Sequence, residues 1–241
     1  MEPEHAMEKV LYVVWPGPAE DIESFGQRLR KSLAPRLKTL DARGLRINLA
    51  DAHVAAAAGI AQRHSDPPVQ ALVQVWLHSA NAALRAPVDA AIGELVARFD
   101  AYLVTESVPL PNTRHPNPGH GQRTEGFAQL ALFARKPGLS DEEFLHLWQD
   151  RHTAVAVETQ SNFEYVQNRV VRALTPGARP LDAVVEECFP AGAMNDPQHF
   201  FDAVGDAVKF ERNLQAMMGS VGRFIDMTRI DVTPTSQYLM Y

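Results

Sequence analysis

The chain has 241 residues, of which 46% are hydrophobic and 22% are charged, and its formal net charge is -6. This composition is typical of an ordinary globular protein, and the length allows two domains of usual size. The negative charge argues against a general nucleic-acid-binding protein, which needs clustered Lys and Arg for phosphate contacts. The lone Cys188 excludes an internal disulfide.

The sequence also predicts no targeting segment. No segment approaches the roughly 18 consecutive apolar residues of a membrane helix. The N-terminal segment MEPEHAMEKV is charged and lacks the apolar core of a signal peptide. We therefore expect a cytoplasmic protein that binds neither membranes nor nucleic acid.

The first half of the chain predicts the order β-α-β-β-α-β. The apolar segment KVLYVVWPG, residues 9–17, predicts a strand ending in a turn, and a helix carrying Phe25 follows. The segment ALVQVWL at 71–77 predicts a later strand. A helix from about 83 to 99 and a strand at 101–108 complete this half.

A linker separates the two halves. Residues 109–126, PLPNTRHPNPGHGQRTEG, are rich in Pro, Gly and polar side chains, which is typical of a linker. The histidines of its HPNPGH segment could bind a stray metal ion, but a polar linker is the favoured interpretation. We expect domains at 7–110 and 126–236, with the linker at 111–125.

The strand predicted at 127–136 has two different faces, because side chains alternate along a strand. One face is uniformly apolar and predicts packing against helices: Ala128, Leu130, Leu132 and Ala134. The other face is mixed and predicts a partly polar cavity: Phe127, Gln129, Ala131, Phe133 and Arg135.

The helix that follows is the most informative element of the sequence. Gly138 marks a turn, and Ser140 is a good N-cap for the helix. Phe144, Trp148 and His152 recur every four residues, so they lie along one side. We expect His152 in the last turn, near the mouth of the cavity.

The second half then repeats the pattern of the first. The segment FEYVQNRVV and residues 183–189, AVVEECF, predict strands. A helix from about 197 to 218 and a strand at 224–232 complete it. When the halves are aligned, Leu29 and Leu33 stand opposite Trp148 and His152. The first half therefore lacks the polar residue of the motif, and we expect one site per chain.

The RKPG turn, the FxxxWxxxH helix and the YxxN strand resemble the EthD domain family over residues 126–233. The resemblance implies an α+β fold of two ferredoxin-like (βαββαβ) repeats, the first a degenerate copy. Their antiparallel sheets would face each other in a dimeric-type α/β barrel formed within one chain, because a bare apolar sheet face must be covered. The alternative is pairing between chains, as a homodimer, although effective concentration favours the internal barrel.

Two residues are candidates for catalysis. His152 has an ordinary pKa of ~6.5, suited to acid-base work, and in some EthD-like barrels the matching histidine is thought to shuttle a proton. The alternative is a histidine that interacts with the helix dipole. Glu186 matches an acid that the family commonly has on this strand. On the cavity face its pKa would be raised by burial; the alternative is an ion pair with Arg135 or Arg169.

The predicted ligand-binding residues extend over several elements. Tyr165 is preferred over Asn168, because it belongs to the more polar face of its strand. Trp76 of the first half would supply the aromatic side chain that the family often has where Cys188 stands. The full predicted set is Trp148, Tyr165, Phe133, Arg135, Gln129, Trp76 and Asp182.

The sequence lacks GxGxxG, P-loop and GxSxG motifs, so we expect no nucleotide cofactor and no serine nucleophile. His146 and His152 lie on different helix faces, so no metal site is predicted. Proton transfer by His152 in a water-excluding barrel predicts a cofactor-independent enzyme acting on a hydrophobic, aromatic or polyketide-like small molecule. The alternative is a non-catalytic binding or accessory protein.

Overall fold

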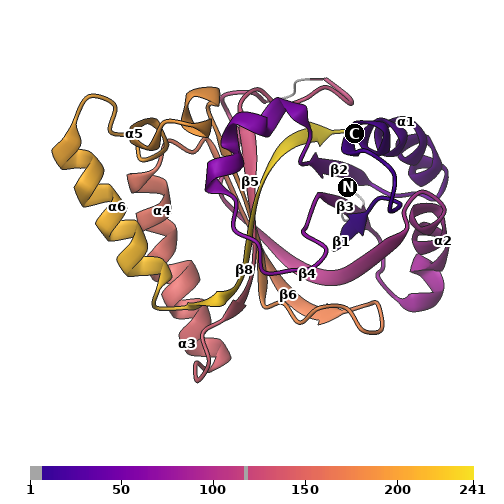
Figure 1. Cartoon of the computed structure of the whole chain (residues 1–241). Coiled ribbons are helices and arrows are strands. Elements are labelled where there is room, and N and C mark those ends of the chain that lie inside the picture. The colour runs from indigo at the N-terminus through magenta and orange to yellow at the C-terminus, as the bar shows by residue number, and fades with distance from the viewer. Residues whose placement is uncertain (1–6, 117–118) are drawn as a thin grey trace, which may run out of the picture.

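Eight strands close into one antiparallel barrel, with helices on two opposite sides of it (Figure 1). The computed structural model describes residues 7–116 and 119–241. Around the barrel the strand order is β1-β3-β2-β8-β5-β7-β6-β4, and each neighbouring pair is antiparallel. The mixed α and β composition and the closed barrel expected from the sequence are confirmed.

The first half contributes four strands and two α-helices. Its elements are β1 (Glu8–Trp15), α1 (Ile22–Thr39), β2 (Gly44–Leu49), the 3-10 helix η1 (Ala52–Ile60), β3 (Ala71–Leu77), α2 (Ala82–Gly93) and β4 (Arg98–Leu110). Residues 111–126 follow, and positions 117 and 118 of this predicted linker segment lie outside the described residues.

The second half repeats this order with a more divided helical layer. Its elements are β5 (Phe127–Arg135), α3 (Asp141–Leu145), the π-helical segment η2 (His146–His152), α4 (Thr153–Thr159), β6 (Glu164–Ala173), β7 (Ala183–Phe189), the 3-10 helix η3 (Ala191–Met194), α5 (Pro197–Phe200), α6 (Ala207–Val221) and β8 (Ile225–Leu239). The strands at 71–77 and 183–189 have the bounds predicted from the sequence.

Local signals explain where the helices begin. The Ser140 side chain accepts a hydrogen bond from the Glu143 backbone N–H, and the Glu143 carboxylate accepts one from the Ser140 N–H, which is a complete capping box. At the starts of α1 and α6, the Asp21 and Asp206 side chains accept a hydrogen bond from the backbone N–H of Ser24 and Lys209, without the reciprocal bond. Asp202, with φ of 48°, lies between α5 and α6, where the sequence had predicted one continuous helix.

Each helical layer packs against the outer face of its own half of the barrel (Figure 1). In the first half, Leu29 and Leu33 of α1 are fully buried against this face. In the second half, Phe144 and Trp148 occupy the corresponding layer together with side chains of α6. The expected packing of Leu29 and Leu33 as structural residues is therefore confirmed.

The predicted orientation of β5 is wrong. Leu130 and Leu132 face the barrel interior, where they pack with Leu11 and Val13 of β1. Phe133 faces the helices instead, and its ring centroid lies 5.8 Å from that of Trp148. An eight-stranded barrel has a narrow interior that medium-sized side chains fill, so the large aromatic side chains occupy the wider space under the helices.

The position of His152 in its helix also differs from the prediction. The helix continues through α4 to Thr159, so His152 lies in the middle of a helical stretch and not in its last turn. Its side chain is 6% exposed, which places it inside the helical layer and not at a mouth. It ends the π-helical segment η2, a kind of irregularity that is frequent at functional sites.

Candidate functional site

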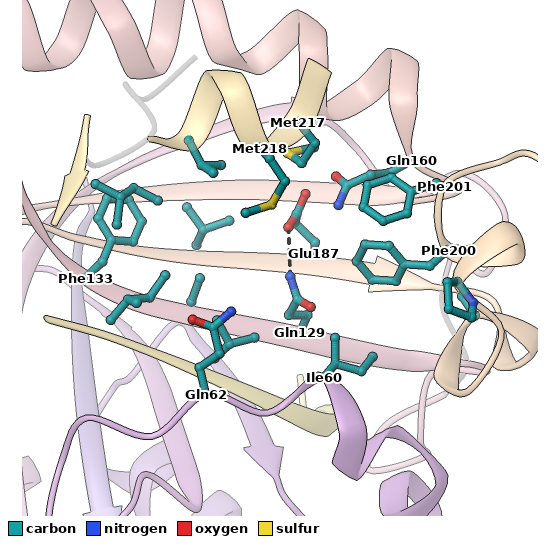
Figure 2. Close-up of a pocket in the computed structure, with 18 of the residues that line it drawn as sticks. Ile60, Gln62, Gln129, Phe133, Gln160, Glu187, Phe200, Phe201, Met217 and Met218 are labelled. Atoms are coloured by element: carbon teal, nitrogen blue, oxygen red, sulfur yellow. Dashed lines mark hydrogen bonds between the residues drawn. The ribbon is translucent and has the colours of Figure 1, made fainter. Parts of the chain in front are cut away.

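A cavity of about 560 Å³ lies between the outer face of the second half's sheet and the helices above it (Figure 2). Its floor is formed by β5, β6, β7 and β8, and its roof by η2, α5 and α6. The first half contributes one wall through Ile60 and Gln62, the end of η1 and the residues after it. Gln62 is fixed there by a backbone bridge to Val232 of β8. The cavity is therefore built by both halves of the chain.

The cavity wall is mainly aromatic and thioether in character. Six aromatic side chains line it: Phe133, Trp148, Tyr165, Phe200, Phe201 and Phe224. Four methionines complete the apolar surface: Met194, Met217, Met218 and Met227. Aromatic walls favour planar apolar ligands, and flexible methionine side chains adapt to the shape of what they contact.

His152 is one of the ionisable groups on this wall. Its Nδ1 lies 2.9 Å from the Ser220 hydroxyl, and its ring centroid lies 5.0 Å from that of Phe224. Burial lowers the pKa of His152 to about 4, because the charged imidazolium loses its solvation. His152 is therefore neutral at pH 7, with Nε2 as the ring nitrogen that remains for a ligand.

Glu187 is a second buried ionisable group in the same cavity. Its carboxylate accepts hydrogen bonds from Asn162 Nδ2 at 3.2 Å and from Gln129 Nε2 at 3.4 Å, the second of which Figure 2 shows. The Gln160 amide nitrogen, in the orientation in which it donates, lies 3.1 Å from the same carboxyl group. Burial raises the pKa of Glu187 to about 7, against the smaller opposite effect of these amides.

Tyr165 of β6, on the floor of the cavity, lies close to Trp148 of η2, in its roof. Tyr165 Oη accepts a hydrogen bond from Gln167 Nε2 at 3.1 Å, and burial raises the pKa of Tyr165 above its usual range. The Trp148 Nε1 lies near this hydroxyl but makes no hydrogen bond of normal geometry. A buried indole N–H without a partner is a donor that a ligand could satisfy.

Glu186 does not share this cavity, which corrects the expectation that it would face the same ligand as His152. Its side chain points into the barrel interior, where Arg46 Nη1 donates to it at 2.8 Å and Asn48 Nδ2 at 2.7 Å. Burial alone would raise the pKa of Glu186, but the Arg46 guanidinium and surrounding amides hold it below the usual range. The expected ion-pair partners Arg135 and Arg169 are also wrong.

Three further predicted ligand residues lie elsewhere. Trp76 is at one end of the barrel, where its Nε1 donates to Glu106 at 2.9 Å. Asp182 accepts from the Arg135 backbone N–H at 2.9 Å, and the Arg135 guanidinium pairs with Asp141 near the surface. Trp76, Arg135 and Asp182 do not line the cavity. The predicted residues that the structure brings together are His152, Trp148, Tyr165, Phe133 and Gln129.

The sequence-based prediction missed Glu187, although a signal for it existed. Gln129 was assigned to a cavity face, and Gln129 pairs directly with Glu187 across the antiparallel β5–β7 ladder. Directly opposite residues in a ladder project from the same face of the sheet. The contribution of η1 had no comparable signal, because it depends on the association of the two halves.

Within residues 7–116 and 119–241, no group of three or more His, Cys, Asp or Glu side chains is arranged to hold a metal ion. In the same part of the chain, no helix combines the length and the apolar character needed to span a membrane.

Comparison with known proteins supports the resemblance seen in the sequence. Residues 136–228 match the EthD domain. No curated protein matches the chain. An anthrone oxidase-like protein has a similar solved structure, with a TM-score of 0.56, 11% identity, and coverage of 99% of this chain and 94% of that one. At this identity the likeness shows the fold alone.

Other solved structures are more distant. A proposed monooxygenase from Lactobacillus acidophilus NCFM has a TM-score of 0.48 and 9% identity, with 96% of this chain and 93% of that one covered. A chlorite dismutase from Candidatus Nitrospira defluvii has a TM-score of 0.45 and 8% identity, with 97% and 92% covered. The direct match is therefore to one segment: residues 136–228, in the second half of this chain, match the EthD domain.

Proposed function

We propose that the chain is a cofactor-independent enzyme that binds an apolar, aromatic or polyketide-like small molecule and transfers a proton on it. The observation that carries this proposal is the cavity of about 560 Å³, in which buried ionisable side chains lie among aromatic and methionine side chains. Pockets of this size and character suit drug-sized ligands, and perturbed ionisable groups in a pocket are candidates for catalysis.

The organisation of the chain supports one site per molecule. We propose that residues 7–110 and 126–236 are two ferredoxin-like repeats joined by the linker 111–125. Both halves have the same strand order, β4-β1-β3-β2 in the first and β8-β5-β7-β6 in the second. Leu33 fills the core in the first half, whereas His152 lines a cavity at the matching place in the second.

His152 is the proposed proton-carrying group on the helical side of the cavity. Ser220 fixes the orientation of its ring, which leaves Nε2 for a ligand. Trp148 and Phe133 form the aromatic wall beside it, and Tyr165 and Gln129 supply polar contacts from the sheet. The name of the anthrone oxidase-like structure is a fold-level analogy in the same direction, because an anthrone is a planar aromatic ketone.

A non-catalytic binding protein is the second candidate, and one observation favours it. A histidine whose pKa is about 4 is a weak base, so His152 alone would be a poor proton acceptor near neutral pH. On this alternative the cavity holds an apolar metabolite for another protein. A cytoplasmic location and a homodimer stay predictions under either candidate.

Native mass spectrometry of the full chain tests the ligand class. We expect a bound apolar small molecule in the wild-type protein, and we expect its loss in Ala131→Trp, because Ala131 lines the cavity and a tryptophan would fill it. Ala154→Trp, on the exposed face of α4, is the matched control and should retain the molecule. Retention of the same molecule by Ala131→Trp would show that it binds elsewhere.

Anthrone is a suitable test ligand for separating the two candidates. An enzyme of the proposed kind accelerates exchange of the acidic ring CH₂ hydrogens of anthrone with solvent deuterium, whereas a carrier binds anthrone and leaves that rate unchanged. Binding that is tight, unaffected by His152→Ala, and without any acceleration of exchange would favour the carrier.

A further inference from the structure

We propose that Glu187 is the proton acceptor of the cavity, and that it takes a proton from a carbon acid in the bound molecule. The inference rests on the proposed enzymatic function and names the residue on which that function depends. Glu187 lies in the middle of the sheet floor, between Gln129 and Met218, with Phe133 toward one end and Phe200 toward the other (Figure 2). A ligand that fills the cavity therefore contacts its carboxyl group.

The surroundings of Glu187 support both of its protonation states. Asn162, Gln129 and Gln160 are neutral donors that can solvate the carboxylate without fixing its charge. In the part of the chain that the structure describes, no Lys, Arg or His forms an ion pair with Glu187. The whole Glu187 residue is only 6% exposed, so water does not compete strongly for its carboxyl group.

The neighbouring residue on β7 shows what a purely structural glutamate looks like in this protein. Glu186 is fully buried on the opposite face and is held as a carboxylate by Arg46. An arginine pair keeps an acid ionised through the whole neutral range. Two adjacent glutamates of the same strand thus have opposite environments, one suited to structure and the other to proton exchange.

The described part of the cavity wall has three other titratable groups beside Glu187. They are Tyr165 on β6, His152 at the end of η2, and Asp196, which caps α5. Burial raises the pKa of Tyr165 and lowers that of His152, so both are neutral near pH 7. β5, β8, α6 and the residues after η1 contribute only amide and apolar side chains to the wall. Because burial raises the pKa of Glu187 to about 7, its base strength matches neutral pH.

The proposed step is a simple proton transfer. The C–H bond next to a carbonyl group of the ligand breaks, and the proton passes to the Glu187 carboxylate. The electron pair of that bond moves to the carbonyl oxygen as an enolate. Neutral donors on the wall, such as Trp148 Nε1, are available to hydrogen-bond the oxygen. The step needs neither an oxidant nor a reductant.

Deuterium exchange of anthrone in D₂O, followed by NMR, tests the step directly. We expect the wild-type protein to accelerate exchange, with a pH profile that rises through about 7. Glu187→Gln should still bind anthrone but exchange it about 10²–10⁴-fold more slowly, the usual loss for one acid-base group. Glu142→Gln removes an exposed carboxylate outside the cavity and is the control that should behave as the wild type.

The two proposals fail in different ways. If Glu187→Gln binds anthrone and exchanges it at the wild-type rate, the inference about Glu187 is wrong. If the wild-type protein neither binds anthrone nor accelerates its exchange, the proposed function is wrong for this class of ligand.

If the wild-type protein does not bind anthrone, or if Glu187→Gln does not fold, a titration without ligand measures the pKa of Glu187 directly. In ¹³C NMR of the wild-type chain with labelled glutamate carboxyl groups, one signal should titrate near 7. Titration of every glutamate carboxyl near or below the ordinary ~4.3 would overturn the inference.

Discussion

The buried carboxyl of Glu187 should make the stability of the protein fall as the pH rises. Its folded pKa of about 7 lies above the ordinary value of 4.5. The folded state therefore binds more protons than the unfolded state between these two values, and the free energy of unfolding decreases with pH in that interval. The stabilising contribution of Glu187 to the free energy of unfolding is fully present below pH 4.5 and is lost as the pH rises through about 7.

The magnitude follows from the same two pKa values. A difference between about 7 and 4.5 corresponds to about 3 kcal/mol at roughly 1.4 kcal/mol for each pKa unit. Glu187→Gln keeps a neutral polar group of similar size and cannot ionise. The difference in free energy of unfolding, variant minus wild type, should therefore rise by about 3 kcal/mol from pH 4 to pH 8, because only the wild type loses the contribution of Glu187 there.

Urea unfolding of both proteins at closely spaced pH values measures this gain. The difference in the free energy of unfolding between variant and wild type isolates Glu187, because other titrating groups are common to both proteins. Glu186→Gln is the contrasting variant, and it should destabilise the protein because it removes the partner of Arg46. A difference for Glu187→Gln that stays constant from pH 4 to pH 8 would refute the proposed environment of Glu187.

Three further predictions use other parts of the fold. Because the pKa of His152 is lowered, this group should add to the free energy of unfolding above pH 6.5, and the addition should be lost as the pH falls through about 4. The loss should reach up to about 3 kcal/mol, and His152→Gln should not show it in urea unfolding at acid pH. Leu33→Ala should destabilise by about 2–5 kcal/mol in the same assay and leave anthrone affinity unchanged, because Leu33 is fully buried in the first half. Arg46→Met should destabilise by about 3–5 kcal/mol, because it leaves Glu186 and Glu164 as buried carboxylates without their cation. A melting temperature of Arg46→Met equal to that of the wild type would contradict the importance of this pair.

The strands and the capping of the second-half helix could be predicted because their signals are local. The strand at residues 183–189 and the Ser140 cap are each indicated by a few neighbouring residues, and the structure agrees with both. The aligned Leu33 and His152 also indicated which half would carry a cavity. These features need no knowledge of how the two halves meet.

The orientation of the sheet faces could not be predicted from the same pattern. Both faces of β5 are buried, one by the barrel interior and one by the helices, so alternation alone does not distinguish them. Phe133 was correctly expected to line a cavity, but that cavity lies under the helices and not inside the barrel. The same error placed Glu186 on the cavity face, whereas its neighbour Glu187 is the residue that lines the cavity.

Contacts between distant segments account for the rest. Arg46 of β2 pairs with Glu186 of β7, and no local sequence pattern predicts a pair between residues so far apart in the chain. Gln62 reaches the cavity because β8 lies beside β2 in the closed barrel. The helix continues beyond His152 to Thr159, and this continuation, α4, lies against α6, which is distant in the sequence.

Methyl NMR of labelled methionines tests most directly where the ligand binds. The chain has seven methionines, and four of them, Met194, Met217, Met218 and Met227, line the cavity. Met240 is buried in the core of the first half and reports on that side of the molecule. Titration with anthrone should shift the four cavity signals, each assigned by its Met→Leu variant, and leave the Met240 signal in place. Shifts confined to Met240, or no shift at the four cavity methionines when anthrone is bound, would contradict a ligand site between the sheet and the helices.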